Sequence, residues 1–171
     1  MKKVIWTGLL AIAVLLVGAF FLIKEITHAQ MPDLETAARL ALDHSALNQV
    51  EGYEQYTGGP TCYVFLGKDK LGRSMMVFST KERVLGSEYL DKGVTGSAAE
   101  DKARKEAGLT EIIKTTPGLV DSLMKNPSAG KASGRFLWEV YGASPQGQKK
   151  YVYLDFYTGN VIATYVLKPT E

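Results

Sequence analysis

The sequence contains one cysteine and two histidines among its 171 residues. A single cysteine cannot form an intrachain disulfide, so an apolar core must hold the fold together. Cys62 stands in the apolar run CYVFL, which predicts a small buried side chain and not a reactive thiol. The histidines, His28 and His44, lack the paired spacing of a zinc site. We therefore expect neither a metal ion nor an organic cofactor.

A strong excess of charge is also missing, because 20 Lys and Arg residues face 18 Asp and Glu residues. Without a basic stripe, nucleic-acid binding is not indicated. The glycine-containing segments 67–72 and 142–147 lie between expected strands, whereas a phosphate-binding loop opens a helix. Two acids, Glu139 and Asp155, stand inside apolar strands. We expect Asp155 to accept hydrogen bonds in the turn at residues 158–159, and Glu139 to lie on a solvated or interdomain face. No catalytic arrangement is indicated, and the protein is predicted not to be an enzyme.

What the sequence does contain is an uncharged apolar run at residues 4–23, VIWTGLLAIAVLLVGAFFLI. A helix rises about 1.5 Å per residue, so this run spans about 30 Å, the thickness of the hydrocarbon core of a bilayer. Its Leu, Ile, Val and Phe side chains together contribute about −4 to −8 kcal/mol to insertion. We predict a permanent transmembrane anchor, whose lipid-embedded side chains include Val4, Trp6, Leu15, Phe20 and Ile23.

A cleaved signal peptide is the main alternative to this anchor. Its apolar region is usually about 7–15 residues long, which is shorter than the run found here. The small-x-small candidate for cleavage, at residues 27–29, lies beyond the charged pair Lys24 and Glu25. Lys2 and Lys3 precede the run and only Lys24 follows closely, which predicts a cytoplasmic N-terminus. We expect a single-pass protein of the cell membrane with an extracytoplasmic C-terminal domain.

After a short linker, the chain shows a helical pattern followed by strand patterns. Asp33 is placed to cap a helix over residues 34–47, whose apolar stripe includes Ala37 and Ala41. Strands are expected at residues 50–56, 61–66, 74–79 and 84–89, with turns between them.

A second block has the same order. Ser97 and Glu100 predict a capping box for a helix that runs to about Ala107 and ends at Gly108. Strands are expected at residues 110–116, 135–141, 150–156 and 161–167. Pro117-Gly118 and the tract at residues 126–134 bracket a loop-like insertion, which extends from about Leu119 to Gly134.

The second block repeats the first, since Gly67 and Gly72 recur 75 residues later as Gly142 and Gly147. Two copies of a helix followed by an antiparallel sheet indicate an internal duplication in an α+β protein. Because each copy is small for an independent core, we expect the halves to pack together. The predicted organisation is a cytoplasmic tip and anchor (1–24), a juxtamembrane linker (25–32), a first unit (33–94) and a second unit (95–171).

Three segments resemble a known family: GKDK after a strand of the first block, and LWEVY followed by YVYLDFYTG in the second. They resemble the YpmB/TseB family, small membrane-anchored proteins of Gram-positive bacteria with two tandem cystatin-like halves related to PepSY domains. The resemblance implies a non-enzymatic regulator of cell-wall (peptidoglycan) elongation that contacts a penicillin-binding transpeptidase. The longer loop at residues 119–134 and Gly142 after Tyr141 depart from the family pattern.

The tyrosines of the second block alternate with aliphatic residues along its strands. Tyr141, Tyr151 and Tyr153 fall on one face, opposite the side chains that should receive the helix. Tyrosine combines a large apolar body with a polar tip and suits protein interfaces. This face is predicted either to bind the partner or to pack against the other half of the duplication.

Two other function classes stay open at this point. One is a PepSY-like peptidase inhibitor or extracytoplasmic chaperone, which inhibition of a co-purified protease would reveal. The other is a hydrolase with an unrecognised site, which would need a cleft lined by converging acids. The favoured prediction is a membrane-anchored regulator that binds a cell-wall synthesis protein.

Overall fold

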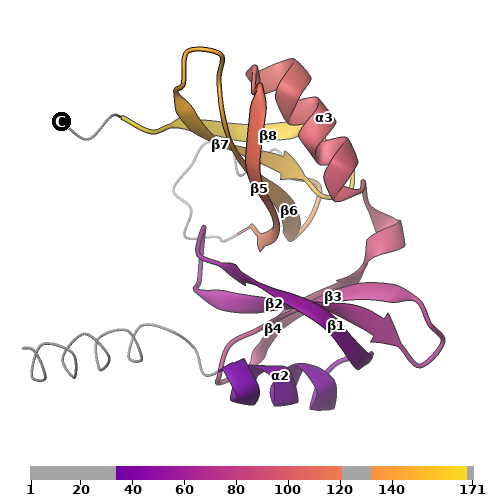
Figure 1. The fold of residues 1–171 in the computed structure, drawn as a ribbon. Helices are drawn as coiled ribbons and strands as arrows, with labels where there is room; N and C mark the ends of the chain where they lie inside the picture. The colour runs from indigo at the N-terminus through magenta and orange to yellow at the C-terminus, as the bar shows by residue number, and fades with distance from the viewer. Residues whose placement is uncertain (1–33, 121–131, 169–171) are drawn as a thin grey trace, which may run out of the picture. The chain divides into compact units, whose positions relative to one another are not determined.

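The computed structural model describes residues 34–120 and 132–168. Two sheets of four strands account for most of this part of the chain (Figure 1). The strands follow one another in the order β1-β2-β3-β4 in the first sheet and β5-β6-β7-β8 in the second, and every neighbouring pair is antiparallel. An α+β fold built of two antiparallel sheets is therefore confirmed.

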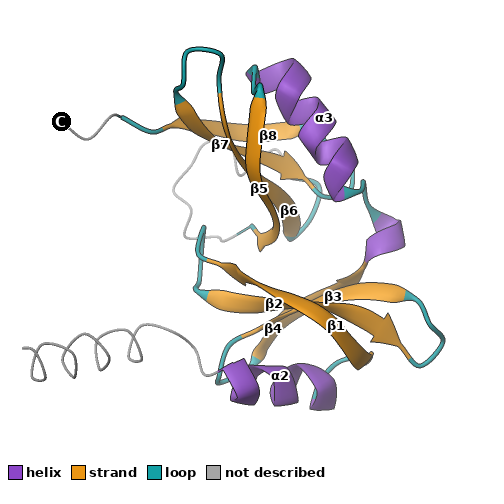
Figure 2. Ribbon diagram, in the orientation of Figure 1, coloured by secondary structure: helices purple, strands orange, loops and turns teal. Residues whose placement is uncertain are grey.

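The elements of the first half are α2 (Leu34–Asp43), β1 (Leu47–Tyr56), β2 (Cys62–Asp69), β3 (Ser74–Ser79) and β4 (Val84–Tyr89). A short 3₁₀ helix, η1 (Leu90–Lys92), leads to the second half. That half consists of α3 (Gly96–Ala107), β5 (Glu111–Leu119), β6 (Phe136–Ala143), β7 (Lys149–Asp155) and β8 (Val161–Val166). Figure 2 shows that each half combines one longer helix with one sheet.

The helix α2 is shorter than its apolar pattern predicts. The hydroxyl of Ser45 donates a hydrogen bond to the carbonyl of Ala41 at 2.6 Å, and the amide of Leu47 donates to that hydroxyl at 3.0 Å. A serine side chain thus takes the carbonyl that a continuing helix would use. The prediction of a helix up to residue 47 was wrong, because Leu47 fills the core as the first residue of β1.

Small residues let each helix approach its own sheet closely. Ala37 and Ala41 in α2, and Ala99 and Ala103 in α3, are fully buried and lie four residues apart, on one helix face. The first helix packs on the first sheet with Phe65, and the second on the second sheet. The predicted arrangement, with each helix on its own antiparallel sheet, is confirmed.

The start of α3 differs from its prediction. The N-cap is Thr95, whose hydroxyl accepts a hydrogen bond from the amide of Ala98 at 3.2 Å. Glu100, the expected partner in a capping box, accepts instead from the hydroxyl of Thr115 at 2.8 Å. The capping box at Ser97 was wrong, whereas Gly108 ends the helix with a left-handed φ of 67°, as predicted.

We expect Thr95→Ala to lower the free energy of unfolding by about 1 kcal/mol, because it leaves the Ala98 amide without its capping oxygen. Ser97→Ala, two residues further on, should change that free energy by less than about 0.5 kcal/mol. Urea unfolding of the full chain in a mild detergent, followed by circular dichroism, measures both. A larger loss for Ser97→Ala than for Thr95→Ala would contradict the cap assignment.

The Pro117-Gly118 pair lies inside β5 and not at the border of a loop, as the sequence suggested. Proline lacks an amide hydrogen but is tolerated in a strand at the edge of a sheet, and β5 is such a strand. Gly118 is needed because a side chain there would collide with the ring of Tyr56 from the first half. Gly118 therefore allows a close approach between the halves.

The central strands of the first sheet, β2 and β3, are buried on both faces. Along β2 and β3, Phe65 and Val77 pack with α2, whereas Val64 and Phe78 join a cluster that includes α3 and the second sheet. Strands buried on both faces read as unbroken apolar runs, which explains CYVF and MMVF in the sequence. Phe78 stacks on Phe136 with ring centroids 5.5 Å apart, so the two halves share one core.

Hydrogen bonds between the halves supplement this core. The hydroxyl of Tyr56 donates to the carbonyl of Leu119 at 3.1 Å, and the indole nitrogen of Trp138 donates to the carbonyl of Val94 at 2.9 Å. Residues 34–171 form one compact unit, so the boundary predicted at residues 94–95 stays a prediction.

The duplication extends to atomic detail. A side chain on Gly67 would overlap the carbonyl oxygen of Gln49, and one on Gly142 would overlap that of Glu111. In both sheets this contact lies beside an irregularity in the pairing of the first two strands. The hairpins that follow are also equivalent: Gly72 and Gly147 take the same left-handed conformation, with φ of 78° and 76°.

Candidate functional site

The face of the second sheet opposite α3 carries the polar and aromatic side chains predicted to bind a partner. Residues paired directly across an antiparallel sheet share a face. Tyr141 pairs with Tyr151, which pairs with Tyr165, and the next row joins Glu139 to Tyr153. We call this set, together with Lys114 beside Tyr141 on β5, the tyrosine-rich face; its members are Lys114, Glu139, Tyr141, Tyr151, Tyr153 and Tyr165.

The aromatic rings of this face contact one another in pairs. Tyr141 and Tyr151 are stacked, with centroids 4.6 Å apart and planes 22° apart. Tyr153 and Tyr165 meet edge to face at 5.6 Å. Tyr165 is 44% exposed and the other three tyrosines are partly exposed. Such pairs restrict the rings before any partner arrives, which lowers the entropic cost of binding.

Glu139 is the half-buried acid of the tyrosine-rich face. Burial raises the pKa of its carboxyl group, whereas a hydrogen bond from Tyr153 and the charge of Lys114 act in the opposite direction. Burial of the ring, and after it the charge of the same carboxylate, raise the pKa of Tyr153. One carboxylate oxygen lies against Gly58 in the β1–β2 connection, so Glu139 touches the first half of the duplication.

The expected contact with the other half of the duplication is found at one end of this face. Its Glu139 end adjoins the first half, through Gly58 and through the ion pair of Lys114 with Glu54, whose Nζ and Oε2 atoms are 2.9 Å apart. The row with Tyr141, Tyr151 and Tyr165 keeps exposed surface. The structure brings the three predicted tyrosines together, and it adds Tyr165, Glu139 and Lys114.

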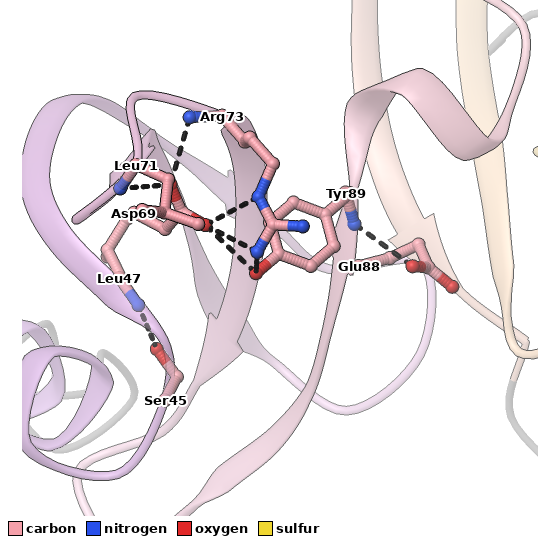
Figure 3. Close-up of polar contacts among 7 residues, drawn as sticks. All are labelled: Ser45, Leu47, Asp69, Leu71, Arg73, Glu88 and Tyr89. Atoms are coloured by element: carbon pink, nitrogen blue, oxygen red, sulfur yellow. Dashed lines mark hydrogen bonds and ion pairs between the residues drawn. The ribbon is translucent and has the colours of Figure 1, made fainter.

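A second polar cluster, at the β2–β3 hairpin, is shown in Figure 3. The Asp69 carboxylate accepts hydrogen bonds from the amides of Leu71 and Arg73, from the Arg73 guanidinium and from the Tyr89 hydroxyl. The Arg73 guanidinium lies over the Tyr89 ring, 4.2 Å from its centroid. Burial disfavours the charged carboxylate, but these hydrogen bonds outweigh it and lower the pKa of Asp69 to about 2. Every group has a partner within the cluster, whose role is to close the hairpin.

The residues considered for chemistry do not form a catalytic site. Cys62 is fully buried, and burial raises the pKa of its thiol to about 12, so the thiolate needed for reaction does not form near neutral pH. Asp155 accepts hydrogen bonds in the turn after β7, as expected. His44 is exposed just after α2. Within the described ranges, no group of three or more His, Cys, Asp or Glu side chains could hold a metal ion.

No family model matches the sequence. The chain is 32% identical over 164 residues to a protein of Bacillus subtilis strain 168 named "Probable cell wall elongation regulator TseB", and the match covers 94% of this chain and 95% of that protein. The chain belongs to the YpmB/TseB family. The resemblance carried by GKDK, LWEVY and YVYLDFYTG is thereby confirmed.

A solved structure of the YpmB/TseB family supports the fold. The "YpmB protein from Bacillus subtilis" superposes with a TM-score of 0.64 at 23% sequence identity, over 78% of this chain and 97% of that one. At this identity the likeness shows the fold alone. The fold described here is therefore similar to that of a solved structure over most of both chains.

The predicted anchor of this YpmB/TseB family member lies outside the described residues. Val4, Trp6, Leu15, Phe20 and Ile23 fall in that part of the chain, as does His28. Within the described ranges, no helix is long and apolar enough to cross a membrane. The partner-binding role of Tyr141, Tyr151 and Tyr153 stays a prediction, although their common face is observed.

Proposed function

We propose that this protein regulates cell-wall elongation without catalysing a reaction, as a single-pass protein of the cell membrane. Residues 4–23 would form the anchor, with the N-terminus in the cytoplasm and two cystatin-like, PepSY-related halves outside it. The partner would be a penicillin-binding transpeptidase. The observation that carries the proposal is the 32% identity, over 94% of the chain, to a protein named as a probable cell-wall elongation regulator.

The geometry of the second sheet supports binding as the mode of action. Interfaces between proteins are enriched in tyrosine, and energetically dominant residues are often Tyr, Trp or Arg. The tyrosine-rich face gathers four tyrosines that are at least partly exposed. Burial of the thiol of Cys62 and the structural role of Asp155 argue against a reaction at either residue.

The experiment is capture of the transpeptidase by the tagged full chain from detergent-solubilised membranes, after crosslinking in cells. We expect the double substitution Tyr151→Ala and Tyr153→Ala to weaken capture about thirtyfold, because truncating a buried tyrosine anchor costs about 2 kcal/mol. Capture should weaken because the substitutions remove ring area at the tyrosine-rich face. The double variant itself should remain folded.

Tyr53→Ala is the matched control, because Tyr53 is 54% exposed on β1 and lies outside the tyrosine-rich face. It should leave capture unchanged. A double variant that melts early would assign Tyr151 and Tyr153 to the core, and a folded double variant with wild-type capture would exclude this face as the interface. Recovery of a protease in place of the transpeptidase, with inhibition of its activity, would support the PepSY-like inhibitor.

A further inference from the structure

The tyrosine-rich face combines aromatic rings with a carboxylate, which is the chemistry that proteins use to bind a cation. A guanidinium or ammonium group is attracted to the electron-rich face of an aromatic ring and to a nearby acid. Glu139 accepts a hydrogen bond from Tyr153, its direct neighbour across β6 and β7, and burial of the ring together with the charge of Glu139 raises the pKa of Tyr151. The Glu139 carboxylate therefore influences two aromatic side chains of this face, Tyr151 and Tyr153.

The cations around Glu139 are paired with other acids. Lys114 is the cation whose charge acts on Glu139. Its Nζ atom, however, lies 2.9 Å from the Oε2 atom of Glu54. A second ion pair lies at the far end of the same face, where the Nζ atom of Lys149 is 3.8 Å from the Oε2 atom of Glu111. Within residues 34–120 and 132–168, the two cations Lys114 and Lys149 are thus paired with other acids, and no ion pair joins a cation to Glu139.

The first sheet shows how this chain arranges such groups when the cation is present. Arg73 lies over the ring of Tyr89, and both donate to the carboxylate of Asp69 (Figure 3). The tyrosine-rich face repeats two of these three parts, a tyrosine hydroxyl that donates to a carboxylate and neighbouring rings. The part that it does not repeat is the guanidinium.

We propose that the tyrosine-rich face binds an arginine side chain of the partner protein, with the guanidinium between Glu139 and the rings of Tyr151 and Tyr153. This rests on the proposed function, since it names the chemistry of the partner segment at the same face. Arginine fits better than lysine because its planar guanidinium stacks on aromatic rings and makes two parallel hydrogen bonds to a carboxylate. The partner segment contributes one arginine to the centre of the interface.

The test titrates the full chain, in a neutral detergent, with N-acetyl-arginine amide. The tyrosine rings carry ¹³C, and single Tyr→Phe substitutions assign their NMR signals. We expect shifts at Tyr141, Tyr151, Tyr153 and Tyr165 that saturate with added arginine. N-acetyl-citrulline amide, which has nearly the same shape but no charge, should leave these signals in place.

Glu139→Gln removes the charge and keeps the shape of the side chain. It should weaken arginine binding about fivefold, a change that corresponds to about 1 kcal/mol. If Glu139→Gln fails to fold, Tyr151→Leu serves as the second variant. It removes one aromatic ring while Glu139 stays unchanged, and it should weaken binding by a similar factor. Equal shifts with citrulline, shifts confined to tyrosines elsewhere, or undiminished binding by these variants would overturn the proposal.

The outcomes separate this inference from the proposed function. If arginine amide does not bind but capture of the transpeptidase depends on Tyr151 and Tyr153, the interface stands without an arginine at its centre. If arginine amide binds as expected but the double tyrosine variant captures the transpeptidase normally, the cation site stands and the proposed interface fails.

Discussion

Asp155→Ala is expected to lower the free energy of unfolding by about 4 kcal/mol. The carboxylate of Asp155 is fully buried and accepts hydrogen bonds from the amides of Tyr157 and Thr158, the hydroxyl of Thr158 and the amide of Ser133. Hydrogen bonds to a charged group contribute about 1.5–3 kcal/mol each, and a buried donor left without a partner costs about 1–3 kcal/mol. Water admitted by the smaller side chain would recover part of this loss.

Thermal or urea unfolding of the full chain in a mild detergent measures the effect. Asp101→Ala is the control, since Asp101 is exposed on α3 and should change the free energy of unfolding by less than about 0.5 kcal/mol. A loss below about 1 kcal/mol for Asp155→Ala would show that the turn is held by other contacts.

The carboxylate of Asp155 also makes the stability of the fold sensitive to acid. Burial disfavours its charged form, but the hydrogen bonds outweigh burial and lower the pKa of Asp155. A carboxyl group whose pKa is lower in the folded state stabilises the protein above its unfolded pKa, about 3.9, and loses that contribution as the pH falls below it. Asp69 behaves in the same way, down to a pKa of about 2. Asp155→Asn should therefore make the loss of stability below about pH 4 shallower without abolishing it.

The sequence predicted those elements whose signals are local. The bounds of β3 and β4 match the expected strands, because apolar runs between turns fix both ends. Gly108 ended its helix as predicted, since a left-handed residue after a helix favours glycine. The recurrence of Gly67 and Gly72 as Gly142 and Gly147 also predicted the duplication.

The errors arose where a contact distant in sequence decided the local structure. Thr95 and Ser97 are both suitable caps, and the helix begins at the earlier one, with Glu100 engaged by Thr115 from β5. Pro117-Gly118 is typical of the border of a loop, but Tyr56, more than sixty residues earlier, lies against Gly118 within a strand. Neither contact can be inferred from spacing along the chain.

The candidate site was predictable only where it depends on local alternation along a strand. Alternation along β6 and β7 places Tyr141, Tyr151 and Tyr153 on one face. Tyr165 joins them only because the pairing of β7 with β8 shifts register between Tyr153 and Leu154. Glu139 was expected on a solvated or interdomain face, but its contact with Gly58 depends on how the halves pack.

The second large effect is expected at the two glycines that mark the duplication. A methyl group on Gly67 would overlap the carbonyl oxygen of Gln49 and press on the side chain of Leu47. One on Gly142 would meet the equivalent pair, Glu111 and Leu109. The obstructing atom is backbone in each sheet, so it cannot rotate away as a side chain would.

We therefore expect Gly67→Ala and Gly142→Ala each to lower the free energy of unfolding by about 3 kcal/mol, the upper end of the usual cost of overpacking. Gly52→Ala is the matched control in the neighbouring strand β1, because nothing lies within 4 Å of the position its methyl group would take. It should be neutral or slightly stabilising, since alanine restricts the unfolded chain more than glycine does. Urea unfolding of the three variants tests the equivalence of the halves: similar losses at Gly67 and Gly142 are expected, and a loss at only one of them would mean that the two sheets tolerate strain differently despite their common geometry.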